Sequence, residues 1–132
     1  MEAVIDKILS ESKTVAVVGI SDKPDRPSHF VARYLQEKGY RVIPVNPLLS
    51  EVLGEKAFKS LSDIPGKVDL VDVFRKSGDV LPVAEEAVRA GARFFWMQEG
   101  VTSEAARDLL TRAGIAVVMD RCVKKELAKR GR

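Results

Sequence analysis

The chain has 132 residues, 45% of them hydrophobic and 31% charged, which is the size and composition of one ordinary globular domain. A formal net charge of +3 is too small to indicate a nucleic-acid-binding protein. The sequence has no run of about 18 apolar residues for a membrane span, and its acidic N-terminal stretch does not have the features of a signal peptide. A single cysteine, Cys122, cannot form an internal disulfide, so we expect a cytoplasmic protein.

The first half of the chain predicts a helix, a strand, a helix and a second strand. Apolar residues at helical spacing predict a helix over about residues 4–9, and "TVAVVGI" (14–20) reads as a buried strand. We expect Ser28 to open the next helix, which ends before Gly39. "YRVIPVN" (40–46) predicts the second strand, although its proline favours a strand end or an irregularity. A turn-rich section then carries a short strand near residues 56–58 and one helical turn.

The second half repeats the alternation of strand and helix. Strands are predicted at "VDLVDVF" (68–74), "RFFWMQ" (93–98) and "IAVVMD" (115–120), with amphipathic helices after Asp79 and after a cap at Thr102 or Ser103. A last helix covers residues 122–129. Strands that alternate with helices of this length predict an α/β fold of the Rossmann-like, doubly wound type. We therefore expect one domain over residues 1–132, with a mainly parallel sheet and helices on both faces.

The segments that follow the strands predict where a ligand binds. In an open parallel sheet, ligands bind outside the carboxyl ends of the strands, where the strand order reverses. These ends are "GISDKPDRPS", "VNPLL", "VFRKSG", "MQEGVT" and "MDRC", and most of them carry glycine, serine, amide or basic groups. A crevice with neutral polar and basic lining favours an anionic ligand.

The loop after the first strand is the strongest candidate for a phosphate-binding loop. Gly19 ends the strand where a side chain would obstruct a ligand, and Ser28 lies at a helix N-terminus, where N–H groups and the dipole attract phosphate. Lys23 and Arg26 add positive charge, and an arginine can bind phosphate through two parallel hydrogen bonds. Proline at position 24 and Pro27 hold the loop in shape. The alternative interpretation is a proline-stiffened surface turn with ordinary helix capping.

The same loops indicate which kind of nucleotide to expect. The G-x-G-x-x-G pattern of NAD-binding loops is absent. No acidic residue follows the second strand to bind a free ribose hydroxyl, because this strand ends in Val45, Asn46 and Pro47. Arg75 and Lys76 supply further cations at the end of the third strand. This charge pattern suits coenzyme A or NADP better than NAD.

Five separated motifs, in order, resemble a known family. "VVGISDKPDRPSHFVARYL", "GYRVIPVNP", "VDLVDVFRKSGDV", "WMQEGV" and "VVMDRC" together resemble the small stand-alone CoA-binding proteins. These are similar in turn to the N-terminal CoA-binding domain of the succinyl-CoA synthetase alpha subunit. The resemblance covers about residues 12–127, which we take as the core of the domain, and it implies a Rossmann-like CoA-binding fold.

The resemblance also implies roles for individual residues in holding coenzyme A. The first loop would hold the phosphates, the end of the second strand would lie beside the adenosine, and the third would flank the nucleotide. The end of the fourth strand would close the crevice toward the pantetheine arm. In that order, the implied residues are Gly19, Ile20, Ser21, Lys23, Arg26, Pro27 and Ser28; Val45, Asn46 and Pro47; Phe74, Arg75 and Lys76; and Gln98, Glu99 and Gly100.

The chain also departs from the synthetase in two ways. Its first loop has fewer glycines, which leaves the exact path of the phosphates open. The phosphorylated histidine of the synthetase lies in a second domain that this sequence does not contain. The resemblance therefore implies ligand binding and does not extend to ligase activity.

Few other residues suggest chemistry. His29 follows the loop and is expected to be solvated or capping, with a hydrogen bond to phosphate as the alternative. Cys122 is interpreted as a structural thiol, with a mixed disulfide to coenzyme A as the alternative. Asp69, Asp72 and Asp120 lie near strand ends, where capping or basic neighbours explain them as well as catalysis does. With one histidine and one cysteine, no zinc site is expected.

Three functions remain open from the residues. The leading one is a protein that binds coenzyme A or an acyl-CoA as a carrier, sensor or subunit, without catalysis of its own. This function leaves room for a protein partner. The second is an NADP-dependent oxidoreductase, which is disfavoured because no substrate domain is evident. The third is a protein or nucleic-acid interaction module that uses the basic tail over residues 124–132. We expect that tail to be a solvated helix end, and Trp96 to pack in the core.

Overall fold

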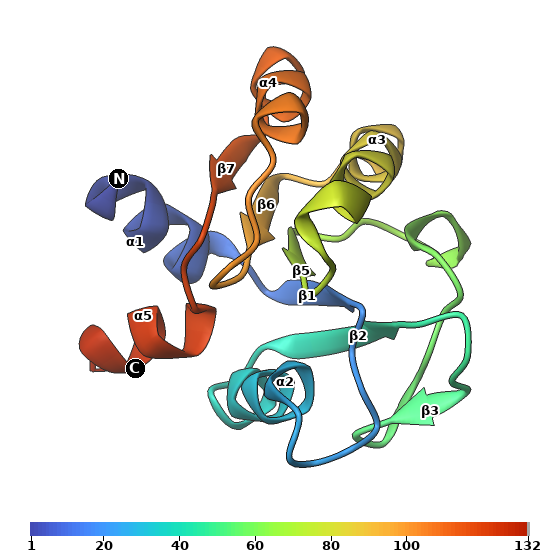
Figure 1. The fold of residues 1–132 in the computed structure, drawn as a ribbon. Helices are drawn as coiled ribbons and strands as arrows, with labels where there is room; N and C mark the ends of the chain where they lie inside the picture. The colour runs from blue at the N-terminus through green and yellow to red at the C-terminus, as the bar shows by residue number, and fades with distance from the viewer. Residues whose placement is uncertain (132) are drawn as a thin grey trace.

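The computed structural model describes residues 1–131, which form a five-stranded parallel sheet covered by helices (Figure 1). Along the sheet the strands follow the order β2 (Arg41–Val45), β1 (Thr14–Val18), β5 (Leu70–Val73), β6 (Phe94–Met97) and β7 (Ala116–Val118). The chain moves outward from β1 to β2 and then returns to the other side of β1 with β5, so the strand order reverses between β1 and β5. The predicted Rossmann-like α/β class is confirmed.

The helices form two layers, one on each face of the sheet. Helices α1 (Glu2–Glu11), α2 (Pro27–Glu37) and α5 (Val123–Lys129) cover one face, and α3 (Val80–Ala90) and α4 (Glu104–Arg112) cover the other. Short 3₁₀ turns occupy Leu61–Asp63 and Ser77–Asp79. Successive strand residues point to opposite faces, so each strand contributes to both apolar layers. Trp96 is fully buried, as predicted, and its Nε1 donates a hydrogen bond to the carbonyl of Arg121 at 2.7 Å.

Pro44 is accommodated because β2 is an edge strand. It lies opposite Val17 of β1, while its carbonyl faces outward and accepts the N–H of Phe58 at 2.9 Å. A proline at this position removes a donor only from the outer edge, where the sheet has no further full strand. The turn-rich section that follows contains a small antiparallel pair, β3 (Glu51–Val52) and β4 (Glu55–Lys56).

The two predicted helix starts differ in outcome. Ser103 caps α4, because its Oγ accepts the N–H of Ala106 at 3.2 Å. The prediction that Ser28 opens α2 is wrong: Arg26 flanks the helix and Pro27 is its first residue, a favoured position for proline. Ser28 follows inside the helix, and its hydroxyl accepts the N–H of Ser21 in the preceding loop at 2.9 Å.

The basic C-terminal segment is solvated on one side, as expected, where Lys125 and Lys129 are exposed, but Arg130 departs from that expectation. The Arg130 side chain is only 13% exposed and forms ion pairs with Glu2 at 2.6 Å, Asp6 at 2.5 Å and Glu126 at 2.8 Å. Arg130 thereby joins α5 to α1. Its charge is neutralised within the chain, so it is not available to a nucleic acid, as the interaction-module hypothesis would require. Residue 132 lies outside the described residues. Among those described, no helix has the length and apolar character needed to cross a membrane.

Candidate functional site

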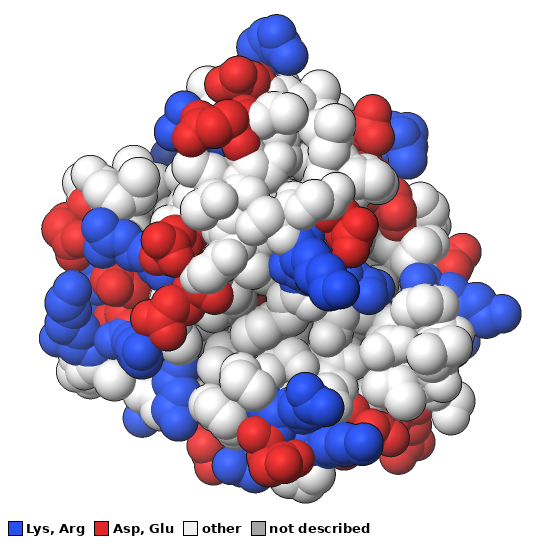
Figure 2. All heavy atoms as spheres, viewed as in Figure 1, with Lys and Arg blue, Asp and Glu red and all other residues white. Residues whose placement is uncertain are grey.

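A cavity of about 730 Å³ opens at the carboxyl ends of β1, β5 and β6, where the strand order reverses. This is the position at which open α/β sheets bind ligands. Figure 2 views this face, which is hollowed near its middle and has lysine and arginine side chains beside the hollow. The lining residues are Gly19, Ser21, Lys23, Arg26, Pro27, Ser28, Phe30, Val31, Phe74, Arg75, Lys76, Gln98, Glu99, Val101, Cys122 and Lys125.

Gly19 allows the loops after β1 and β5 to approach each other closely. Its φ of +87° is one that residues with side chains rarely adopt, and a Cβ atom added there would lie 2.2 Å from the carbonyl oxygen of Phe74. The N–H of Phe74 in turn donates to the carbonyl of Val18 at 2.8 Å. The glycine is therefore required by the neighbouring backbone at the floor of the site.

The loop after β1 is held in shape by its own hydrogen bonds. Ser21 is the centre: its N–H donates to Ser28 Oγ at 2.9 Å, and its Oγ accepts the N–H of Lys23 at 3.0 Å. His29 Nδ1 lies 2.9 Å from the carbonyl of Ser21, and the imidazole is only 8% exposed. Of the two expectations for His29, a solvated or a capping side chain, the solvated one is wrong, because the side chain bonds to the loop that precedes α2. Because several loop N–H groups are already bonded, side-chain cations are the main attraction for an anion here.

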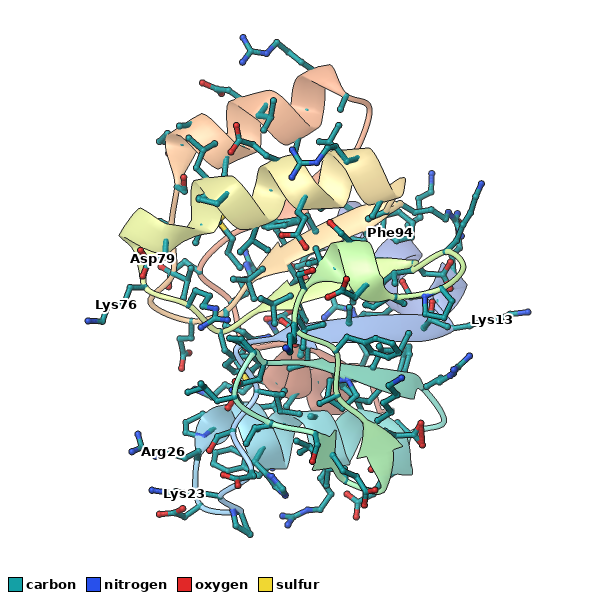
Figure 3. All side chains as sticks on the ribbon, turned by 90° about the vertical axis from the view of Figure 1, so that its right-hand side faces the viewer. Lys13, Lys23, Arg26, Lys76, Asp79 and Phe94 are labelled. Atoms are coloured by element: carbon teal, nitrogen blue, oxygen red, sulfur yellow. The ribbon has the colours of Figure 1, made fainter. Side chains whose placement is uncertain are left out.

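Four cations surround the mouth of the cavity without an ion-pair partner among residues 1–131. Lys23, Arg26 and Lys76 are exposed and Arg75 is half-buried. In Figure 3 the three labelled members, Lys23, Arg26 and Lys76, lie on one side of the molecule, opposite Lys13. We call these four residues the cationic rim. Unpaired cations beside a preformed cavity favour a ligand with several phosphate groups.

The opposite wall comes from β6 and α5 and carries both charges. Lys125 Nζ lies 3.0 Å from one oxygen of Glu99 and 3.1 Å from the other, and the hydrogen bond to that carboxylate raises the pKa of Lys125. Cys122, the residue before α5, packs against the core and also lines the cavity. The Cys122 thiol therefore contacts the core and also lines the cavity.

A buried carboxyl lies next to this wall. Asp72 in β5 is fully inaccessible, and Gln98 Nε2, from the end of β6, lies 2.5 Å from its Oδ1. Burial raises the pKa of Asp72 to about 7. Neither capping nor a basic neighbour, the structural explanations that the sequence offered, accounts for Asp72, because its side chain points into the layer beneath α1, α2 and α5 and its hydrogen-bond partner is Gln98.

Asp69, in contrast, is a structural acid at the opposite end of the sheet. Its Oδ2 accepts the N–H groups of Lys13 at 2.8 Å and Thr14 at 3.1 Å. Burial raises the pKa of Asp69, but these backbone hydrogen bonds outweigh it and hold the pKa below its usual value. This position ties the segment before β5 to the start of β1.

The residues implied by the resemblance do not all reach the cavity. The loop cations, the serines, Phe74, Gln98 and Glu99 line it, as given above. Ile20 and Val45 are buried in the core. Asn46 Nδ2 donates to the carbonyl of Ile20 at 2.8 Å, so it braces the first loop from behind. Pro47 and Gly100 are exposed and are not lining residues, although the N–H of Gly100 bonds to Asp120.

Five lining residues were not predicted for the site: Phe30, Val31, Val101, Cys122 and Lys125. Phe30 and Val31 belong to the helix directly after the loop, so their proximity to it was the available signal. Lys125 had no such signal, because α5 is the last helix of the chain and reaches the cavity only through tertiary packing. Lys124 of the same helix lies over the rings of Phe30 and Tyr34, at 5.2 and 5.3 Å from their centres.

Comparison with known proteins assigns the family. Residues 13–128 match the sequence model of the CoA binding domain. The chain belongs to the CoA binding domain family. The protein YneT of Bacillus subtilis is 48% identical over 123 residues, which are 93% of this chain and 91% of YneT. A solved structure from Thermus thermophilus, of the protein designated cell-free ID.343, is 39% identical, with a TM-score of 0.92 and 98% of each chain covered.

Parts of larger enzymes are similar as well. The alpha subunit of ADP-forming acetate–CoA ligase II from Pyrococcus furiosus is 46% identical over 57 residues, which are 42% of this chain. Those residues are only 12% of the ligase subunit. The family members of this kind therefore carry the domain as one portion of a longer CoA ligase.

Proposed function

We propose that the cavity binds coenzyme A or an acyl-CoA, and that the chain acts as a carrier, sensor or subunit without catalysis of its own. The observation that carries this proposal is the cationic rim, whose four members have no ion-pair partner among residues 1–131. Membership of the CoA binding domain family supports this ligand over NADP. Coenzyme A has three phosphate groups and a long arm, which suit a positive rim that leads into a deep cavity.

The rim and the inner wall suit different parts of the ligand. Lys23 and Arg26, beside the N-terminus of α2, would hold the diphosphate. Arg75 and Lys76 would hold the phosphate on the ribose. The pantetheine arm would then run past Phe74 toward the wall that contains Gln98 and Cys122, which brings a ligand thiol or thioester to that wall.

The arrangement of the ionisable groups supports a binding role. The single histidine bonds to the loop carbonyl of Ser21 and is not a lining residue, so it is not positioned as a base for Cys122. Lys125, the lining cation nearest to that cysteine in sequence, is held by Glu99. A nucleophile with an adjacent base, as covalent catalysis needs, is not assembled among the described lining residues.

Thermal shift and calorimetric titration with CoA, dephospho-CoA and NADP⁺ test this proposal. CoA at about 100 times its Kd should stabilise the folded protein by about 2.7 kcal/mol, which raises Tm by several degrees. Dephospho-CoA, which lacks the ribose phosphate, should bind more weakly by about tenfold. Absence of any shift with CoA and dephospho-CoA at millimolar concentration would overturn the proposal, and a larger shift with NADP⁺ would favour the oxidoreductase.

A further inference from the structure

The contact between Asp72 and Gln98 is unusual in its geometry. Asp72 Oδ2 is buried and has no hydrogen-bond partner among residues 1–131, while Oδ1 lies 2.5 Å from the terminal amide of Gln98. An ionised carboxylate in that position would leave a charged oxygen buried and unbonded, which costs several kcal/mol. A neutral carboxyl avoids most of that cost. The surroundings therefore favour Asp72 in its protonated form.

A protonated carboxyl and a glutamine amide can pair in one way only. The O–H of the carboxyl donates, and the amide accepts through its oxygen. The two ends of a glutamine amide have nearly the same shape, so the hydrogen-bond network decides which end faces which neighbour. A protonated Asp72 donates to Gln98 Oε1, and the Nε2 group then faces the other way.

Gln98 connects this buried contact to the ligand site. Gln98 is only 3% exposed, yet it is one of the residues that line the cavity. We propose that Asp72 is a positioning residue: its O–H holds Gln98 Oε1, so that Gln98 Nε2 donates into the cavity and forms a subsite for a carbonyl oxygen of the ligand. Resting on the proposed function, this subsite takes an amide or thioester carbonyl of the pantetheine arm.

In the two protonation states of Asp72, opposite ends of the Gln98 side-chain amide face the cavity. When Asp72 ionises, it accepts from Gln98 Nε2, and the Oε1 atom turns toward the cavity, where it faces the ligand carbonyl unfavourably. Burial raises the pKa of Asp72 to about 7, opposed by the hydrogen bond from Gln98, so both states occur near neutral pH. The carbonyl subsite is therefore present below about pH 7 and lost above it.

Other ionisable groups on the sheet face that α1, α2 and α5 cover do not account for the raised pKa of Asp72. Across the sheet, Asp72 lies between Val17 of β1 and Trp96 of β6, which are both apolar neighbours. Burial raises the pKa of Asp72, the hydrogen bond from Gln98 opposes this rise, and no charged side chain contributes to it. The buried or half-buried ionisable residues of the helices on this face, and of the turns next to them, are His29, Tyr34, Tyr40, Arg121, Cys122, Lys124, Glu126 and Arg130.

Calorimetric titration of CoA at pH 6.0 and pH 8.5 tests the subsite in wild type and in Asp72→Asn. Asparagine does not titrate, so the end of the Gln98 amide that faces the cavity stays the same at every pH. We expect the Kd of wild type to rise between the two pH values by about five- to tenfold more than that of Asp72→Asn. The titration of the CoA phosphates is common to both proteins and cancels in this comparison. Equal ratios in the two proteins would overturn the proposal.

A second measurement on wild type tests the positioning without a ligand or a variant. In a ¹³C and ¹⁵N NMR titration, the Asp72 carboxyl and the Gln98 side-chain amide should shift together, with one midpoint near pH 7. An Asp72 carboxyl that titrates near 4, or a Gln98 amide that does not follow it, would overturn the proposal. Failure of CoA to bind at both pH values would count against the proposed function alone, because the NMR titration does not depend on CoA.

Discussion

The two ends of the parallel sheet treat their polar groups in opposite ways. At the amino ends, Asp69 accepts two backbone N–H groups, and Arg93 pairs with Glu11 at 2.6 Å. At the carboxyl ends, the cationic rim has no ion-pair partners among the described residues, and one oxygen of Asp72 has no hydrogen bond. Groups satisfied within the chain stabilise the fold, whereas the unpaired cations around the cavity are available to a ligand. The buried oxygen of Asp72 can influence a ligand only through Gln98. This comparison distinguishes charged residues that stabilise the fold from charged residues that are available to a ligand. The sequence alone does not show which residues belong to which group.

The largest expected effect compares a glycine at each end. Gly19 and Gly39 both have positive φ, of +87° and +96°, but only Gly19 lies against neighbouring backbone. We expect Gly19→Ala to lower the free energy of unfolding by about 3 kcal/mol or more, because the new Cβ collides with the Phe74 carbonyl. Gly39→Ala should cost only about 1 kcal/mol, from backbone strain. Urea unfolding measures both, and equal losses would contradict the close approach of the two loops.

The two aspartates of the segment before and within β5 should give opposite pH dependences of stability. The folded pKa of Asp72 is raised to about 7, so its stabilisation is complete below the unfolded pKa near 4 and is lost as the pH rises through 7. The loss is on the order of 4 kcal/mol and should disappear in Asp72→Asn. The folded pKa of Asp69 is lowered, so its contribution is present above pH 4 and is lost as the pH falls. Urea unfolding from pH 3 to pH 9 checks both signs.

Removing one arginine from each end should separate ligand binding from stability. Arg26→Ala should weaken CoA binding by about 10- to 30-fold with little change in Tm, because its guanidinium is exposed and unpaired. Arg93→Ala removes a paired arginine far from the cavity and should leave the Kd within about twofold. Calorimetry of the two variants is the measurement. A comparable loss of affinity in both would indicate general electrostatic attraction and not a site at the rim.

The smallest expected effect concerns the thiol of Cys122, in the cavity wall formed by β6 and α5. Cys122 is half-buried and lines the cavity, so saturating CoA should slow its alkylation by iodoacetamide about fivefold or more, simply by covering it. Mass spectrometry of the alkylated protein gives the rates, and NAD⁺ at the same concentration is the control. An unchanged rate would mean that the ligand does not extend to the wall formed by β6 and α5.

Much of the fold could be predicted because it depends on local patterns. Runs of β-branched residues such as 14–18 form strands buried on both faces, and helical spacing of apolar residues gave every helix. The loop after β1 was identified by its position between a strand and a helix and by its charges. The predictions for Ser28, His29 and Asp72 failed for one physical reason. Each of these side chains forms a hydrogen bond with a residue that is not its neighbour in sequence, and local patterns do not reveal such a partner.

The sequence by itself determined the α/β class, the end of the sheet at which the cavity opens, and the family resemblance. These follow from periodicity, from chain order and from motifs, which need no knowledge of distant contacts. Only the tertiary structure decided which cations are free. Arg130 and Lys125 are engaged by acids from α1 and from the β6 end, whereas Lys23 and Arg26 are not. Pairing of charges, burial of Asp72 and the lining of the cavity depend on residues far apart in sequence, and only packing brings these together.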